Sequence, residues 1–154
     1  MKKITIIGMA LLMAVLFSRA AGAHCEIPCG IYGDDMRFDM MEEHIQTLEK
    51  SIGMINELTA EGEKNYNQIV RWTMNKEHHA DAMREILTQY FLAQRIKPPA
   101  PDDEDAGSKY MDQLSMVHLL IINLMKTKQN TDLEYTEKLK ELLHDFEHSY
   151  MLKD

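Results

Sequence analysis

Hydrophobic side chains recur every three or four residues along most of the chain beyond residue 33. This spacing gathers them on one face of an α-helix. The first expected helix carries Ile45, Leu48, Ile52, Ile55 and Leu58, and further runs with helical spacing cover residues 69–91, 114–125 and 139–150. No stretch shows the period of two that is typical of a half-buried β-strand, so the pattern predicts an all-α fold.

The segments between these runs contain residues that end or begin helices. Gly62 lies in the first break, and three prolines within residues 98–101 precede an acidic run in the second. Proline lacks the amide hydrogen that a helix interior needs, so the second helix must end there. The third break, "KQNTDLE", offers Thr131 or Asp132 as a helix N-cap. Four helices joined by short links predict a four-helix bundle over residues 34–154.

The first 23 residues have a different character and predict a cleaved signal peptide. Lys2 and Lys3 precede an apolar run over residues 4–17, and the small residues Ala21-Gly22-Ala23 follow it. This order is typical of a secretory signal that is removed after the small-residue segment. The apolar run is shorter than the about 20 residues of a membrane-spanning helix, which disfavours a retained anchor. We therefore expect export to a periplasmic or extracellular location, the alternative being a cytoplasmic protein matured by removal of a propeptide.

Cleavage after Ala23 defines the composition of the mature protein. Removing 23 of the 154 residues leaves 131, enough for one domain with its own core. The removed segment carries three basic residues and no acidic one, so the net charge changes from −8 to −11. Such an acidic chain is not expected to bind nucleic acid or an anionic membrane.

The same cleavage, by a signal peptidase or another processing protease, makes His24 the N-terminal residue, directly before the first of the two cysteines, Cys25 and Cys29. A metal can displace the proton of the new α-amine, whose ordinary pKa is near 8. The amine, the Cys25 amide nitrogen and the two thiolates can form a planar set of two nitrogens and two sulfurs, with Pro28 helping the chain to turn back. The His24 imidazole is left as a fifth, axial ligand. A square-planar set indicates Ni(II) or Cu(II), because zinc prefers a tetrahedron.

The segment "HCEIPCGIY" resembles the N-terminal nickel hook of the nickel superoxide dismutase family, whose pattern is His-Cys-x-x-Pro-Cys-Gly-x-Tyr. All six fixed positions match, namely His24, Cys25, Pro28, Cys29, Gly30 and Tyr32. Residues 24–33 therefore form the expected hook. The segment "NKEHHADAMREIL" and the later "YF" and "KPP" also resemble the family's second helix and the loop that follows it.

The resemblance implies dismutation of superoxide to dioxygen and hydrogen peroxide, with a nickel cofactor that alternates between Ni(III) and Ni(II). It implies nickel ligation by the His24 amine and imidazole, the Cys25 amide nitrogen and thiolate, and the Cys29 thiolate. By the same resemblance, Pro28 closes the hook with a cis peptide bond, and Tyr32 lines the opening above the metal. A four-helix fold and a homohexamer are implied as well.

Candidates for residues around the metal ligands come from the same comparison. Glu26 stands where the family often has aspartate. Asp39, in the sequence Arg37-Phe38-Asp39, is the candidate for the carboxylate that orients the axial imidazole. His79 takes the place of the arginine that pairs with this carboxylate in the family, which would make the pair sensitive to pH.

Other interpretations of the same residues remain open at this level. Cys25 and Cys29 can instead form a disulfide in an exported helical bundle with an unidentified binding surface. A carrier of nickel or copper could use the same hook without catalysis, although it would have no clear need for Pro28, Gly30 or Tyr32. A di-iron bundle needs Glu-x-x-His on two helices, and the chain has this motif once, at Glu141 to His144.

Overall fold

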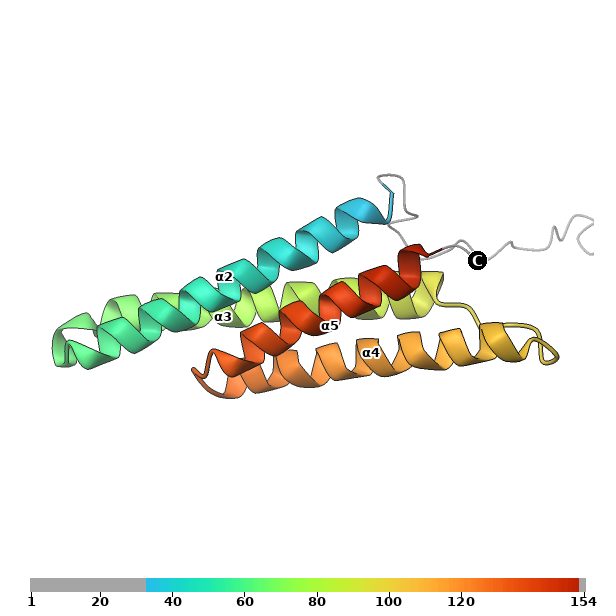
Figure 1. Cartoon of the computed structure of the whole chain (residues 1–154). Helices are drawn as coiled ribbons and strands as arrows, with labels where there is room; N and C mark the ends of the chain where they lie inside the picture. The colour runs from blue at the N-terminus through green and yellow to red at the C-terminus, as the bar shows by residue number, and fades with distance from the viewer. Residues whose placement is uncertain (1–32, 153–154) are drawn as a thin grey trace, which may run out of the picture.

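Four long helical segments, each antiparallel to the next, make up the part of the chain that the computed structural model describes, residues 33–152 (Figure 1). The expected signal peptide and hook residues 24–32 lie outside the described residues. The helices are α2 (Asp35–Ala60), α3 (Tyr66–Glu85), α4 (Glu104–Gln129) and α5 (Glu134–Met151). A short 3-10 helix, η1 (Glu63–Asn65), precedes α3, and a π-helix, η2 (Ile86–Arg95), continues it. The prediction of an all-α four-helix bundle is confirmed.

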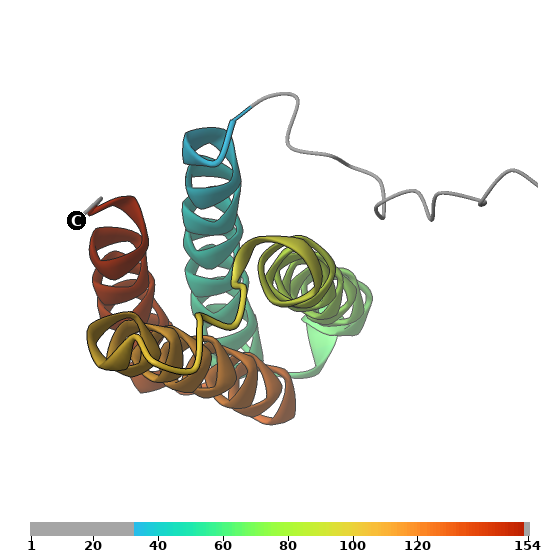
Figure 2. The ribbon, with the colours of Figure 1, turned by 90° about the vertical axis from the view of Figure 1, so that its right-hand side faces the viewer.

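Seen along the bundle, the four helices form a square (Figure 2). In it, α2 contacts α3 and α5, and α4 contacts the same two helices from the other side. Because the chain runs up, down, up and down, the start of α2, the end of η2 and the end of α5 meet at one end of the bundle. The hook precedes α2 in the sequence, so its attachment point is at this end. Among residues 33–152, no helix combines the length and apolar content that crossing a membrane requires.

The apolar faces predicted from the sequence form most of the core, although Met125 at the end of the third run is 46% exposed and two positions on α3 are exposed as well. Ile45, Leu48 and Ile52 are completely or almost completely buried, but Val70 and Met74 of α3 are 56% and 67% exposed. The turn that joins α2 to α3 extends beyond the other two helices (Figure 1). Residues on the outer side of this projecting hairpin therefore have no neighbouring helix to cover them.

Aromatic rings fill the core at the end where α2 begins. The Phe38 ring of α2 lies 4.9 Å from Phe91 of η2, 5.4 Å from Phe146 of α5 and 5.7 Å from Tyr150 of α5, measured between ring centroids. Tilted rings at these separations attract one another in addition to burying apolar area. The first turns of α2 are thus packed firmly against two other helical segments.

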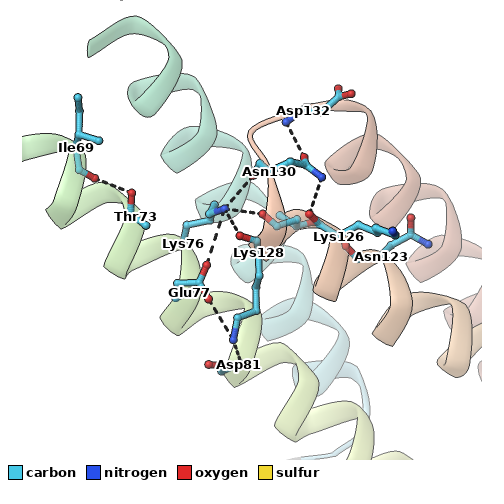
Figure 3. A network of polar contacts seen from close by, with 11 residues as sticks. Ile69, Thr73, Lys76, Glu77, Asp81, Asn123, Lys126, Lys128, Asn130 and Asp132 are labelled. Atoms are coloured by element: carbon cyan, nitrogen blue, oxygen red, sulfur yellow. Dashed lines mark hydrogen bonds and ion pairs between the residues drawn. The ribbon is translucent and has the colours of Figure 1, made fainter. Parts of the chain in front are cut away.

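A buried lysine holds the opposite end of the bundle together (Figure 3). Lys76 of α3 is only 3% exposed, and its ammonium donates hydrogen bonds of 2.7, 2.8 and 2.9 Å to the backbone carbonyls of Thr127, Lys128 and Asn130. Thr127 and Lys128 lie in the last turn of α4 and Asn130 is its C-cap, where backbone acceptors lack partners within the helix. A cation is also favoured there by the helix dipole. Lys76 therefore links α3 to the C-terminus of α4.

A second lysine reinforces this link from the surface. The Lys128 ammonium lies 3.2 Å from Glu77 Oε2 and 2.8 Å from Asp81 Oδ1, both on α3. The next helix, α5, begins at Glu134 rather than directly after the expected cap at Asp132. The Asp132 carboxylate still accepts a 3.0 Å hydrogen bond from the Glu134 amide, so this residue shapes the turn.

Candidate functional site

The expected metal ligands His24, Cys25 and Cys29, together with Glu26, Pro28 and Tyr32, lie outside the described residues. What the structure describes is the junction between this segment and the bundle. Gly33 has a φ of 83°, in the left-handed region that glycine adopts without strain. Asp34 follows as the residue before the first turn of α2, and its carbonyl accepts hydrogen bonds from the amides of Arg37 and Phe38 at 2.9 and 3.3 Å.

The Asp34 carboxylate is the centre of a polar cluster at this junction. Its Oδ1 accepts a short hydrogen bond from the Tyr90 hydroxyl, and its Oδ2 accepts one of 2.9 Å from the Tyr150 hydroxyl. The Nε atom of Arg95 lies 3.1 Å from Oδ1, which forms an ion pair. Arg95 also donates a 2.9 Å hydrogen bond to the Tyr90 hydroxyl. The start of α2 is thereby joined to both η2 and α5.

The π-helical winding of η2 brings two members of this cluster together. A π-helix bonds residues five apart, as the 2.9 Å hydrogen bond from the Ile96 amide to the Phe91 carbonyl illustrates. Tyr90 and Arg95 have the same separation, and the Arg95 guanidinium lies 5.0 Å from the centroid of the Tyr90 ring. Arg37 of α2 lies over the same ring at 4.9 Å. Short π-helical segments occur frequently at functional sites.

These contacts change the proton affinities of the cluster. Burial opposes ionisation of Asp34, but the hydrogen bonds from Tyr90 and Tyr150 and the charge of Arg95 outweigh it, and the pKa of Asp34 is lowered. Burial and the hydrogen bond to Asp34 raise the pKa of Tyr150, and the same two causes raise that of Tyr90. At neutral pH the cluster is therefore a carboxylate held by two neutral hydroxyls and one guanidinium.

A groove of about 800 Å³ runs beside this cluster, between α2 and the α3–η2 segment. Arg37, Arg84 and Tyr90 line it together with the acidic residues Asp81 and Glu85. Asp81 and Arg84 form an ion pair of 2.9 Å within α3. The two cationic side chains that line the groove thus come from α2 and from α3, which are far apart in the sequence.

The structure does not bring Asp39 and His79 together. Asp39 is exposed and lines a groove between α2 and α5 with Lys140, His144 and Glu147. His79 of α3 faces a different side of α2, because its Nδ1 lies 2.9 Å from Nδ1 of His44. The role that we predicted for each residue toward the axial imidazole stays a prediction, since His24 is not among the described residues.

The pair of His44 and His79 is a feature that the sequence pattern did not indicate. At a separation of 2.9 Å, one ring nitrogen must donate and the other accept, so a single proton lies between them. Burial, followed by the charge of the neighbouring histidines, lowers the pKa of both rings. Both rings are therefore neutral at physiological pH.

The remaining candidates do not assemble into a metal site within residues 33–152. The structure places no group of three or more histidine, cysteine, aspartate or glutamate side chains close enough to hold an ion in this part of the chain. His144 is 80% exposed and stacks on His148 with ring centroids 6.5 Å apart.

A scan against family models matches the nickel-containing superoxide dismutases over residues 19–153 of the 154-residue chain. The chain belongs to this family. The match spans the hook motif and all four helices, so a single family model covers both the N-terminal donors and the bundle described above. No curated protein and no solved structure matches the chain in the other two comparisons.

Membership of this nickel superoxide dismutase family establishes the class of reaction. The protein is an oxidoreductase that acts on superoxide and uses nickel. Within the described residues, Asp34 and its partners Tyr90, Arg95 and Tyr150 hold the start of α2, which follows the hook in the sequence. The sequence pattern did not indicate this cluster, because the partners of Asp34 are 56 to 116 positions away from it.

Proposed function

We propose that this superoxide dismutase binds its nickel at the N-terminus created by removal of residues 1–23. The ligands are the His24 amine and imidazole, the Cys25 amide nitrogen and thiolate, and the Cys29 thiolate. The observation that carries the proposal is the family match across residues 19–153, which includes the complete hook motif. The chemistry of this donor set suits the metal, because amine, amide and thiolate donors in one plane favour Ni(II) over zinc.

When bound, nickel supplies one-electron exchange between Ni(III) and Ni(II), which thiolate and amide donors bring into an accessible range. The protein's own residues have separate tasks. The His24 imidazole would add a further nitrogen ligand to the nickel, and Tyr32 would limit access to the metal and order water beside it. Glu26 is the candidate for a carboxylate near the opening, and Asp39 is the candidate for the carboxylate that orients the His24 imidazole. His79 pairs with His44 and not with Asp39.

We further propose that the mature chain is exported and assembles into a homohexamer. The exposed apolar side chains support self-association. Tyr66, Val70 and Met74 are spaced four residues apart on α3 and are 62%, 56% and 67% exposed, which places a hydrophobic stripe on the projecting hairpin. A stripe of this kind is suited to burial against another copy of the chain.

The deciding experiment uses the chain purified from cells grown with nickel. Intact mass spectrometry gives its N-terminus and metal content, and superoxide consumption is assayed on the same sample. A mass that starts at His24, a single nickel per chain and loss of activity in His24→Gln support the proposal. His118→Gln is the matched control, because His118 is exposed on α4 and lies outside the groove that Asp39 lines.

Two other results would contradict the proposed function. Nickel bound to a chain that starts at His24 but does not consume superoxide would indicate a carrier. A metal-free chain lighter by two hydrogens would show that Cys25 and Cys29 form a disulfide, and the proposed ligand set would then be wrong.

A further inference from the structure

Asp34 occupies the N-cap position of α2 but does not cap it. An aspartate at this position ordinarily accepts a hydrogen bond from an amide in the first turn of its own helix. Here the Asp34 side chain makes no such bond. Both carboxylate oxygens are instead directed to other parts of the bundle, Oδ1 to Tyr90 and Arg95 and Oδ2 to Tyr150. The first turn of α2 therefore has no cap from the Asp34 side chain, and the carboxylate links the helix to η2 and α5 instead.

This link fixes the position of a single point on the chain from two sides. Tyr90 and Arg95 belong to η2, whereas Tyr150 lies in the last turns of α5. The Tyr150 ring is itself held by Phe38 and Phe91, with ring centroids 5.7 and 5.3 Å away. The acceptor at Asp34 therefore faces donors whose positions are set by the aromatic core.

The point that is fixed lies next to the hook. Gly33 makes the turn with positive φ, and Asp34 is five residues after the proposed ligand Cys29. Five residues span less than about 18 Å, so a shift of Asp34 moves one end of the short segment that leads to Cys29. A metal site on a loop depends on the structure that anchors the loop.

We propose that Asp34 is a positioning residue, whose carboxylate, held by Tyr90, Tyr150 and Arg95, fixes the place where the nickel-binding segment leaves the bundle. This inference rests on the proposed function for its consequence at the metal. Its structural part, the immobilisation of the first turn of α2, is independent of nickel. Asp34 touches neither the substrate nor the metal in this role.

The test compares Asp34→Asn with Asp35→Asn in the full chain purified from cells grown with nickel. Both changes remove one negative charge at neighbouring positions, but Asp35 is exposed and only Asp34 holds the cluster. Three quantities are measured on each protein: the rate of nickel loss to EDTA, hydrogen exchange of the amides at residues 35–38, and exchange in the middle of α4. Tyr150→Phe and the double variant with Asp34→Asn complete a cycle.

We expect Asp34→Asn to lose nickel about tenfold faster than Asp35→Asn, the lower end of the effect of removing a residue that supports metal ligands. Exchange at residues 35–38 should increase, and exchange in α4 should not. The effects of Tyr150→Phe and Asp34→Asn on nickel loss should be less than additive, because both remove the same link.

Equal nickel loss and equal exchange in Asp34→Asn and Asp35→Asn would overturn the inference while leaving the proposed function intact. Faster exchange throughout α4 as well would also overturn it, because Asp34 would then support global stability rather than position the segment. A parent chain that holds no nickel would instead contradict the proposed function. In that case the exchange of residues 35–38 still tests the link itself.

Discussion

Replacing Lys76 by methionine removes the ammonium that joins α3 to the end of α4. Methionine keeps an unbranched chain of similar length, so the loss of packing is small. The ammonium donates three hydrogen bonds of 2.7–2.9 Å, and one of its acceptors, the Thr127 carbonyl, belongs to a residue that is completely buried. The substitution therefore isolates the polar link from the apolar core around it.

The magnitude follows from what each carbonyl can do without its donor. A buried acceptor left unpaired costs about 1–3 kcal/mol, which applies to Thr127. The carbonyls of Lys128 and Asn130 are closer to the surface and can bind water, so they contribute little. Loss of a cation at a partly buried helix C-terminus adds about 1 kcal/mol. We expect Lys76→Met to lower the free energy of unfolding by about 2–4 kcal/mol.

Urea unfolding followed by far-ultraviolet circular dichroism measures this difference, and Lys64→Met serves as the control. Lys64 is exposed, so its replacement should change stability by less than about 0.5 kcal/mol. A Lys76→Met protein as stable as Lys64→Met would refute the reasoning. Burial of the Lys76 ammonium is unfavourable, and it lowers the pKa of this group. Equal stability would mean that the cost of burying the charge cancels the free energy gained from all three hydrogen bonds.

Two further predictions concern the histidine pair and the hydrophobic stripe. The lowered pKa values of His44 and His79 mean that the unfolded chain binds more protons than the folded one below pH 6.5. Stability should therefore fall as the pH decreases through 6.5, and His79→Gln should reduce this slope in urea titrations at successive pH values. Met74→Glu places a charge in the exposed stripe on α3, so we expect association to weaken by tenfold or more, about 1.4 kcal/mol, in light scattering after size-exclusion chromatography.

Each of these has a matched control. His144→Gln should leave the pH slope unchanged because His144 is 80% exposed, and a slope that is the same in all three proteins would contradict the role of the pair. Gln68→Glu adds the same charge at an exposed position outside the stripe. If both glutamate variants assemble like the parent, the stripe is not an interface.

The helices and most of the core followed from the sequence because hydrophobic spacing reports directly on which face of a helix is buried. Ile45, Leu48 and Ile52 are buried as the spacing requires. Val70 was counted with the second apolar run, yet it is 56% exposed, since spacing does not reveal which helix end projects beyond its neighbours. The π-helical winding of η2 was also missed, because residues 69–91 fit an ordinary helical period.

The candidate site also has one part that the sequence alone predicts and another part that depends on the fold. The hook motif is local, so its residues could be named from the sequence alone. The contacts around Asp34 depend on Tyr90 and Tyr150 meeting at one end of the bundle, which only the topology determines. Asp39 and His79 were paired by alignment to a family pattern, and the structure places them on different sides of α2.

The up-and-down course of the chain has a practical consequence for anyone who wishes to label or immobilise this enzyme. The start of α2, the end of α5 and the loop between η2 and α4 all lie at the same end of the bundle (Figure 1). The proposed use of the His24 amine excludes an N-terminal tag, and a tag after α5 would emerge at the same end of the bundle as the start of α2. A dye or surface linker attached at Ser115, which is exposed in the middle of α4, avoids this end of the bundle and also the α2–α3 hairpin proposed for self-association.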